Sequence, residues 1–266
     1  MGKPTARNAD RHALYELSVQ EPGADLDFVE RMYKKIRGKG PTLLREDFCG
    51  TAALSCEWVR RRRKNCALGV DLDPEVLEWG RRHHFGRLGE AAGRVQLVEA
   101  DVLEVQRPKA DLTLAMNFSY YVFKTRPELL RYLRSAYRAL KPDGVMVLDA
   151  FGGSDSQIVL HEKKRVKGRG FTYVWDQAAF NPITNDITCH IHFEFADGTR
   201  MRRAFTYHWR LWSLVEVCEA LREVGFRTAD VYWEGDGEDG TGDGVFRFRK
   251  CAENSRGWIA YIVAAK

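Results

Sequence analysis

The sequence predicts an α/β fold with a doubly wound, Rossmann-like and mostly parallel sheet, and with an antiparallel β insertion after the fifth strand. Two patterns lead to this prediction. From residue 41 to about residue 155, short apolar runs alternate with amphipathic segments, which is typical of βαβ units around a parallel sheet. Between about 156 and 210, strand-like runs follow one another with only short turns between them, as in an antiparallel meander.

The elements of the first part follow from their periodicity. Before residue 40 the chain is polar and carries one helical pattern, DLDFVERMYKKI, which Gly38, Gly40 and Pro41 bring to an end. Asp73 is interpreted as a helix N-cap, with Pro74 at the first helical position. The next strands and helices are, in order, PTLLREDF (strand), TAALSCEWVRRRRK (helix), ALGVDL (strand), DPEVLEWGRRHH (helix), VQLVEA and ADLTLAMNF (strands), RPELLRYLRSAYRAL (helix, ended by KPDG) and GVMVLDAF (strand).

The second part begins with a basic stretch that we interpret as a loop. It holds Lys163, Lys164, Arg165, Lys167 and Arg169. The elements expected after it are the strands GFTYVWDQAAF, DITCHIHFEF and TRMRRAFTYHWR, the helix SLVEVCEALREVGF, the strand TADVYWEG, the Gly/Asp-rich loop GDGEDGTGDG and the last strand WIAYIVAAK. Because this helix and the last strands continue the earlier pattern, we expect them to complete the parallel sheet.

Composition excludes several classes of protein. With 44% hydrophobic and 30% charged residues, the chain is typical of a soluble globular protein. No apolar run approaches the roughly 18 residues of a membrane span, and the N-terminus has no apolar signal region, so we expect a cytoplasmic protein. The six cysteines are scattered without zinc spacing, so we expect reduced thiols and no metal. A net charge of +5 is low for a protein that binds nucleic acid.

Polar residues stand where four consecutive predicted strands end. The first strand runs into Glu46 and a Gly-containing turn, 46–52, that opens a helix. About twenty residues later the second strand ends at Asp71, the position at which a doubly wound fold presents a carboxylate to ribose hydroxyls. The third strand ends at Asp101 and the fourth at Asn117. Since ligands of open α/β sheets bind beyond the carboxyl ends of the strands, these residues predict a site for a nucleotide-like ligand.

At these residues the chain resembles the class I S-adenosylmethionine-dependent methyltransferases, over about residues 41 to 151. The stretch 46–52 is similar to the first motif of that family, an acidic residue followed by Gly-x-Gly-x-Gly, and LKPDGVMVLD is similar to the turn and strand after its fourth helix. The resemblance implies S-adenosylmethionine as the cofactor. It also implies roles for Glu46 (methionine moiety), Gly50 (under the ligand), Asp71 (ribose), Leu72 (packing on adenine) and Asp101 with Val102 (adenine edge). The predicted cofactor set further includes Tyr15, Phe48, Cys49 and Asn117.

Two of the three motif glycines are replaced, by Phe48 and Ala52. A dinucleotide needs the full glycine pattern so that the backbone can approach its pyrophosphate, whereas S-adenosylmethionine has no phosphate. The replacements therefore disfavour NAD more than S-adenosylmethionine. Cys49 is interpreted as a packing residue, because nothing near it in sequence looks like a base for a catalytic thiol.

Candidate catalytic residues come from the fourth strand end and from the meander. Asn117-Phe118-Ser119-Tyr120 stands where amino-methylating members of the family carry Asn-Pro-Pro-Tyr, so Asn117 is a candidate to accept from an amine N–H and Tyr120 to stack on the acceptor. The alternative is that Asn117 caps the strand and Tyr120 lines the cofactor pocket. His190 and His208 are the candidates for a general base, which an oxygen or carbon nucleophile needs and a neutral amine does not.

The meander is expected to form a roof over the acceptor, because it leaves the sheet directly after the fifth strand and is dense in aromatic and histidine residues. The alternative is that most of these aromatic residues pack in the core. The predicted substrate residues are Tyr121, Trp175, His192, Tyr207 and Arg210. The whole chain is expected to form one methyltransferase domain, composed of an N-terminal cap (1–40), a cofactor-binding core (41–155), the insertion or lid (156–210) and a C-terminal part that completes the sheet (211–266).

Three functions remain open on this evidence. The leading prediction is methyl transfer to a small-molecule acceptor, at nitrogen in preference to oxygen, by a monomer or homodimer that does not bind membranes. An RNA or protein methyltransferase is the second, since the basic run 60–64 and the basic stretch 163–169 are candidate contacts for an acidic partner. For the first run the alternative is a helix end whose cations complement the dipole. The third possible function is that of a non-catalytic S-adenosylmethionine-binding module.

Overall fold

An eight-stranded, mostly parallel sheet forms the centre of the molecule, in a computed structural model that describes residues 4–237 and 242–266. Its strand order is β11-β10-β12-β5-β4-β1-β2-β3. The first five strands pair in parallel, whereas β12 is antiparallel to both β5 and β10. The predicted doubly wound sheet is therefore confirmed. The strands are β1 (Leu43–Asp47), β2 (Cys66–Asp71), β3 (Val95–Glu99), β4 (Ala110–Ala115), β5 (Leu140–Gly152), β10 (Thr228–Asp236), β11 (Gly242–Phe248) and β12 (Trp258–Ala265).

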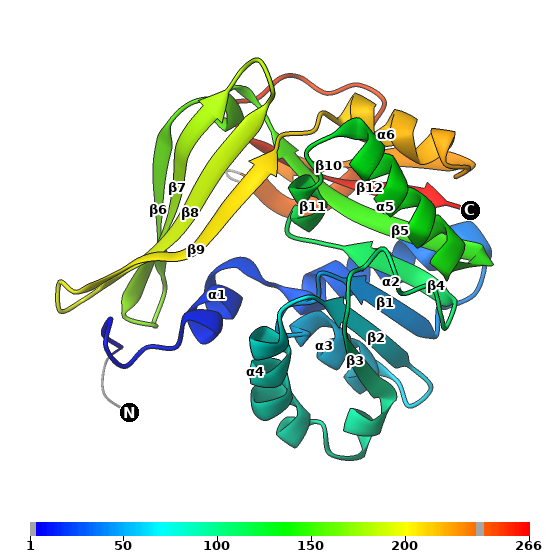
Figure 1. Ribbon diagram of the computed structural model, residues 1–266, viewed down its shortest axis with the longest axis horizontal. Coiled ribbons are helices and arrows are strands. Elements are labelled where there is room, and N and C mark those ends of the chain that lie inside the picture. Colours follow the sequence, from blue (N-terminus) through cyan, green and yellow to red (C-terminus); the bar gives the residue numbers. More distant parts are fainter. Residues whose placement is uncertain (1–3, 238–241) are drawn as a thin grey trace.

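Helices cover both faces of this sheet (Figure 1). One face carries α2 (Pro22–Arg37), α3 (Ala53–Arg61) and α4 (Pro74–His84), and the other carries α5 (Arg126–Ala139) and α6 (Leu214–Glu223). The predicted cap of α4 is confirmed, because the Asp73 carboxylate accepts from the backbone N–H groups of Glu75 and Val76. In the part of the chain that the structure describes, no helix is long and apolar enough to cross a membrane.

A second, antiparallel sheet is inserted between β5 and α6 (Figure 1). It consists of β6 (Leu160–Val166), β7 (Phe171–Asn181), β8 (Asp186–Phe195) and β9 (Arg200–Arg210). The expected meander corresponds to β7, β8 and β9. The interpretation of the basic stretch as a loop is wrong for residues 163–166, which belong to β6 and pair with β7, whereas Lys167 and Arg169 lie in the turn between the two strands. An edge strand with polar residues on both faces lacks the apolar alternation by which strands are recognised.

Three other details differ from the sequence prediction. A short helix, α1 (Arg11–Val19), precedes α2, and its N-cap is the Asp10 carboxylate. The Gly/Asp-rich segment 235–244, expected as a loop, contains the end of β10 and the start of β11, and its residues 238–241 lie outside the described part of the chain. The KPDG segment, expected as a turn, lies within β5, where the pairing with β4 is irregular. The short 3₁₀ turns are η1 (Phe85–Arg87), η2 (Gly89–Arg94), η3 (Ser119–Val122) and η4 (Ser154–Gln157).

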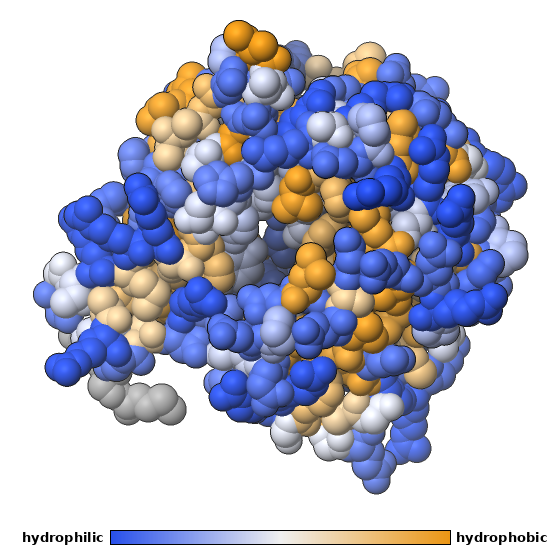
Figure 2. Space-filling view, in the orientation of Figure 1, coloured by the Kyte–Doolittle hydropathy of each residue, from blue (hydrophilic) through white to orange (hydrophobic). Residues whose placement is uncertain are grey.

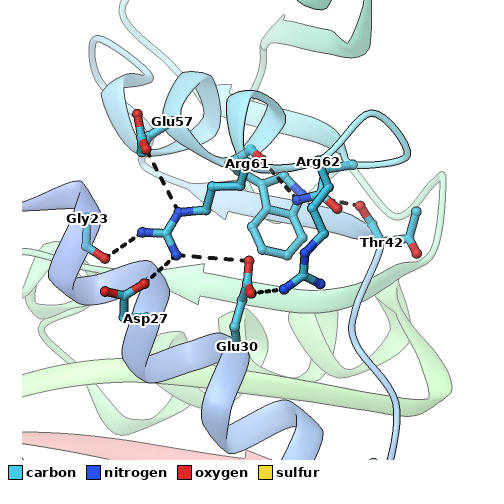
Figure 3. A network of polar contacts seen from close by, with 9 residues as sticks. Gly23, Asp27, Glu30, Thr42, Glu57, Arg61 and Arg62 are labelled. Carbon is cyan, nitrogen blue, oxygen red and sulfur yellow. Dashed lines mark hydrogen bonds and ion pairs between the residues drawn. The ribbon is translucent and has the colours of Figure 1, made fainter.

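The basic end of α3 is tied to α2 (Figure 3). Arg61 donates to the carboxylate of Asp27 at 2.7 Å and to the carbonyl of Gly23 at 2.7 Å, and Arg62 pairs with Glu30. Below them, the indole of Trp58 donates to the carbonyl of Thr42 at 3.2 Å, which joins α3 to the start of β1. Arg61 and Arg62 in the run 60–64 thus have structural partners, as the helix-end interpretation expected.

Candidate active site

Two adjoining cavities lie where the carboxyl ends of the central strands face the antiparallel sheet. The first, of about 610 Å³, is lined by the loop 48–52 between β1 and α3, and we call it the loop cavity. The second, of about 510 Å³, is lined by aromatic side chains of β5, β7, β9 and β12, and we call it the aromatic cavity. Figure 2 shows a hollow in this part of the surface. The two cavities share four lining residues, which are Tyr15, Asn117, Tyr207 and Trp209.

The loop 48–52 has an alternating left-handed backbone. Phe48, Gly50 and Ala52, the three positions of the glycine motif, have φ angles of 57°, 52° and 58°. Residues with a Cβ adopt this conformation only when the surrounding structure holds them there. Ala52 is fully buried at the start of α3, and the ring of Phe48 packs on Tyr132 with centroids 5.5 Å apart. The loop thus keeps the backbone that a glycine motif provides, although two of its glycines are replaced.

The carboxylate of Asp71 supports this loop from the end of β2. Its Oδ2 accepts from the backbone N–H of Gly50 at 2.7 Å, and its Oδ1 accepts from the N–H of Asp73 at 3.0 Å. A carboxylate offers about four lone-pair sites. Since Asp71 also lines the loop cavity, each oxygen keeps acceptor capacity for a ligand hydroxyl.

Glu46 lies at the end of β1 and lines the same cavity. Its Oε2 accepts from both the backbone N–H and the hydroxyl of Ser55, in the first turn of α3. Burial raises the pKa of the Glu46 carboxyl to about 7, while the two bonds from Ser55 lower it. A cationic ligand group beside Glu46 would therefore stabilise the ionised form of this side chain.

Cys49 also lines the loop cavity, but its side chain is 2% exposed. Burial raises the pKa of this thiol well above its ordinary value, and the nearby carboxylate of Glu46 raises it further. The thiol therefore stays protonated at neutral pH, which agrees with a packing role.

Helix α1 lies between α4 and the antiparallel sheet (Figure 1), and its residues Arg11, His12 and Tyr15 line the loop cavity. The carboxylate of Asp10 accepts from the indole N–H of Trp79 on α4 at 2.7 Å. Glu16 accepts from the hydroxyl of Thr51 at 2.5 Å and lies 2.7 Å from the ring nitrogen of His84. These contacts place Tyr15 between the two cavities. The sequence analysis missed this helix, although Asp10 ahead of RHALYELSV is an N-cap signal.

The aromatic cavity is walled by stacked rings. Tyr207 and Trp209 stack at 4.3 Å between ring centroids, and Trp175 lies 6.4 Å from each of them. Trp175 is held by Gln177, which accepts from its indole N–H at 3.3 Å. Further walls come from Phe118, Phe151, Tyr173 and Trp258.

The charged lining of the aromatic cavity is mostly acidic. Among the described residues that line it, the carboxylates are Asp155, Glu162 and Glu234 and the guanidinium is that of Arg256. Arg256 pairs with Asp155 at 3.2 Å. An aromatic wall combined with carboxylates favours a cationic or amine-bearing ligand over an anionic one.

Two predicted residues from the fourth strand end, Tyr120 and Tyr121, lie in the core. Both are fully buried, because the 3₁₀ turn η3 directs them toward α5 and β9 and away from the two cavities. The hydroxyl of Tyr121 donates to backbone carbonyls of Phe151 and Trp212, each at 3.4 Å. Direct contact of either tyrosine with an acceptor is therefore not supported. Asn117, by contrast, lines both cavities.

The histidines of the meander face away from the aromatic cavity. On β8 the odd-numbered side chains from Ile187 to Phe195 pack inward, so the alternation of the strand puts His190 and His192 on the outer face. There His190 bonds to the hydroxyl of Thr206 at 2.9 Å and His192 to the carboxylate of Asp176 at 3.0 Å. The prediction of His190 as a general base and His192 as a substrate contact is thus contradicted.

The two remaining candidates at the end of β9 have other partners. His208 lies 3.3 Å from the hydroxyl of Thr188 on the same outer face. Arg210 donates to Glu216 at 2.9 Å and stacks over Trp212 at 3.7 Å from the ring centroid. The predictions of His208 as a general base and Arg210 as a substrate contact are therefore corrected. Odd and even positions of β9 face opposite sides of the sheet, and among the described residues of β9 it is Tyr207 and Trp209 that line the aromatic cavity.

Three of the predicted adenine contacts lie outside the lining of the loop cavity. Leu72 follows Asp71 and is 67% exposed, which leaves an apolar surface beside the site. Asp101 accepts from the N–H of Leu103 at 2.9 Å. Val102 is a core residue whose carbonyl accepts from Arg45 at 2.9 Å. Their adenine contacts stay predictions.

The sequence analysis missed most of the aromatic cavity outside the meander. Its lining includes Phe151 from β5, Asp155 from η4, Glu162 from β6 and Trp258 from β12, which are far apart in sequence. The only local signal was the position of the insertion directly after the fifth strand, which places it at the ligand edge of the sheet.

Comparison with known proteins agrees with this geometry. Residues 48–144 match the family model described as a methyltransferase domain. No protein of the curated set matches the sequence. The predicted resemblance to class I S-adenosylmethionine-dependent methyltransferases is confirmed by this match and by the fold of solved structures.

Three solved structures illustrate the likeness. DesVI of Streptomyces venezuelae has a TM-score of 0.68 at 18% identity, over 97% of this chain and 98% of that chain. CalS10 of Micromonospora echinaspora is an amino pentose methyltransferase with S-adenosylmethionine bound. Its TM-score is 0.66 at 16% identity, over 96% of this chain and 95% of that chain. KedS8 of Streptoalloteichus, a sugar N-methyltransferase, has a TM-score of 0.60 at 18% identity, over 100% of this chain and 95% of that chain. At these identities the likeness establishes the fold.

Proposed function

We propose, for a chain that carries a methyltransferase domain with the class I fold, that it transfers a methyl group from S-adenosylmethionine to an amine of a small molecule. The observation that carries this proposal is the shared wall of the two cavities. A donor in the loop cavity and an acceptor in the aromatic cavity meet at Tyr15, Asn117, Tyr207 and Trp209. Methyl transfer requires two ligands held in contact, in line and shielded from bulk water.

The loop cavity suits the donor. Asp71 offers free acceptor capacity to ribose hydroxyls, and Glu46 offers a carboxylate to the ammonium group of the methionine moiety. Gly50 leaves open space toward the cavity, where a ligand can approach the backbone. Leu72, Asp101 and Val102 remain our candidates for adenine.

The aromatic cavity suits an amine on a small, partly apolar scaffold. The stacked rings of Trp175, Tyr207 and Trp209 offer faces for such a scaffold, and the carboxylates attract a cationic group. KedS8, described as a sugar N-methyltransferase, supports nitrogen as the methyl acceptor, and CalS10, described as an amino pentose methyltransferase, supports an acceptor that bears an amine.

The reaction needs little acid–base help from the protein. The lone pair of the neutral amine forms the N–C bond as the C–S bond of the sulfonium breaks, and the nitrogen releases its proton afterwards. This fits a site in which the histidines of the insertion lie on the far face of the sheet. The role left to the chain is to hold both ligands at near-attack distance.

The test combines binding with turnover. Calorimetry should show one S-adenosylmethionine site, and a panel of cyclic primary amines, each paired with the alcohol of the same scaffold, should be screened with labelled methyl donor. We expect transfer to amines and none to the matched alcohols. Failure to bind the donor contradicts the proposed activity, and transfer to the alcohols alone contradicts the choice of nitrogen.

A further inference from the structure

The turn after β4 has an unusual backbone. Asn117 and Phe118 are consecutive and both have φ angles of 58°. Asparagine tolerates the left-handed region, but phenylalanine rarely enters it, so this turn requires an outside support.

The support comes from Asp149 on the neighbouring strand β5. Its Oδ2 accepts from the N–H of Asn117 at 2.7 Å, and its Oδ1 accepts from the N–H of Phe118 at 2.8 Å. The side chain of Asp149 is 6% exposed and belongs to the lining of neither cavity. The hydrogen bonds of the Asp149 side chain therefore reach the two cavities through the turn.

The turn, in contrast, reaches both ligand sites. Asn117 lines the wall between the cavities, and Phe118 lines the aromatic cavity. The ring of Phe118 packs on Phe151 at 4.7 Å between centroids and lies 6.4 Å from that of Trp209. A rotation of this turn would move the shared wall and one side of the aromatic cavity together.

We propose that Asp149 is a positioning residue for methyl transfer: by holding the N–H groups of Asn117 and Phe118, it fixes the turn that aligns the acceptor with the methyl donor. This inference rests on the proposed function. It also predicts a larger effect on turnover than on donor affinity, since the hydrogen bonds of Asp149 go to the turn and not to the loop 48–52.

The electrostatic surroundings agree with this role. Burial raises the pKa of the Asp149 carboxyl to about 7, and the N–H groups of Phe118 and Asn117 lower it. When Asp149 takes up a proton, one acceptor oxygen becomes a donor facing an N–H group, so the turn loses a bond. The titratable groups that interact with Asp149 are Asp25 and the tyrosines Tyr15, Tyr120, Tyr121 and Tyr261.

Asp111 provides a matched control. It is also 6% exposed, and its Oδ2 accepts from two consecutive N–H groups, of Thr42 at 3.1 Å and Leu43 at 2.8 Å. Asp111 lies at the start of β4, at the opposite edge of the sheet, and its Oδ1 accepts from Lys141 at 2.8 Å. Replacing either aspartate by asparagine preserves size and removes one acceptor.

The experiment compares Asp149→Asn and Asp111→Asn with the unmodified chain. It measures the S-adenosylmethionine Kd by calorimetry, and kcat and KM with the best amine of the panel. We expect Asp149→Asn to lower kcat about tenfold or more with the donor Kd within about threefold, and Asp111→Asn to leave kcat within about twofold. A kcat for Asp149→Asn equal to that of Asp111→Asn overturns the inference.

A second measurement needs neither a variant nor an acceptor. In the unmodified chain, the NMR shifts of the Asn117 and Phe118 amides should titrate together with a midpoint near the Asp149 pKa of about 7. If the chemical shifts of these two amides do not change with pH around 7, the inference is overturned, whatever turnover is measured. Absence of turnover together with titrating amides defeats the proposed function instead and leaves Asp149 as the support of the turn.

Discussion

The two cavities are built in opposite ways. The carboxylates that line the loop cavity all come from the ends of β1 and β2 and the residues next to them, between Glu46 and Asp73, and the rest of its lining comes mainly from α1, the turn after β4 and β9. The aromatic cavity draws on the turn after β4 and on β5, β6, β7, β9 and β12, and each segment supplies one or a few side chains. In the first, the proposed binding groups are backbone N–H groups and carboxylates close to them in sequence. In the second, they are large side chains from distant segments, so the shape of this cavity depends on how whole elements pack.

The difference implies that donor binding and acceptor binding can be damaged separately. The donor site should respond to single changes of backbone conformation or charge. The acceptor site should respond to lost aromatic surface. Four experiments test whether donor binding and acceptor binding can be damaged separately. The largest effect is expected at the loop 48–52.

Gly50→Val should abolish measurable donor binding. Gly50 has a φ of 52°, a region that a β-branched residue resists, and its added side chain would enter the open space of the cavity. Gly38→Val is the matched control, because Gly38 has a φ of 69° and open space around it but lies outside the cavity, at the end of α2. Calorimetry should show lost binding in the first variant alone. Equal donor affinities in the two variants would contradict the role of Gly50.

Asp71→Ala should weaken S-adenosylmethionine binding by about 1.5–3 kcal/mol, roughly ten- to hundredfold, because ribose hydroxyls lose a charged acceptor. The N–H of Gly50 also loses its partner, so the loop should become more mobile. The acceptor KM at saturating donor should change little. An unchanged donor Kd by calorimetry would rule out the assignment of Asp71.

Trp175→Ala should raise the acceptor KM or lower turnover by about tenfold, with the donor affinity changed by less than about 1 kcal/mol. Trp175 lines the aromatic cavity alone, whereas Tyr207 lines both, so Tyr207→Ala should affect both ligands. His190→Ala, on the outer face of the same sheet, is the control. Thermal unfolding must confirm folding first, since removal of a core aromatic residue costs about 3–5 kcal/mol. A Trp175 variant that loses donor affinity as strongly as the Tyr207 variant would break the separation of the two cavities.

The smallest effect concerns pH. Burial raises the pKa of Glu46 to about 7, so below that pH the carboxyl is largely protonated and cannot pair with the ammonium group of the donor. Affinity for S-adenosylmethionine should therefore increase as pH rises through 7, by up to about eightfold between pH 6 and 7.5. Calorimetry in buffers of different ionisation enthalpy should detect proton release on binding, and Glu46→Gln should remove both effects. A pH-independent Kd in the unmodified chain would exclude the proposed contact.

The same contrast explains which parts of the site were predictable. Glu46, Gly50 and Asp71 were found because each follows a recognisable strand, and the ends of parallel strands meet at one edge of a sheet. The retained left-handed backbone at Phe48 and Ala52 was not predictable, since neither residue favours it. Packing of Phe48 and burial of Ala52 decide it.

The acceptor side shows the limit of strand periodicity. Alternation correctly grouped His190 with His192, and Tyr207 with Trp209, but it does not say which group faces a cavity when both faces carry large side chains. Tyr120 and Tyr121 were misjudged because a short 3₁₀ turn decides their direction. The edge strand β6 was missed because it lacks apolar alternation, and helix α1 was missed because the residues that hold it, Thr51 and His84, are distant in sequence.

The sequence by itself determined the order of strands and helices, the parallel sheet and the carboxylates at the strand ends, because apolar periodicity and turn chemistry act within stretches of about twenty residues. Only the tertiary structure decided the aromatic cavity, the lining that α1 provides and the support of the turn by Asp149. Those features depend on which surfaces pack together. Packing joins residues as far apart as Tyr15 and Trp258, and no local pattern encodes such a contact.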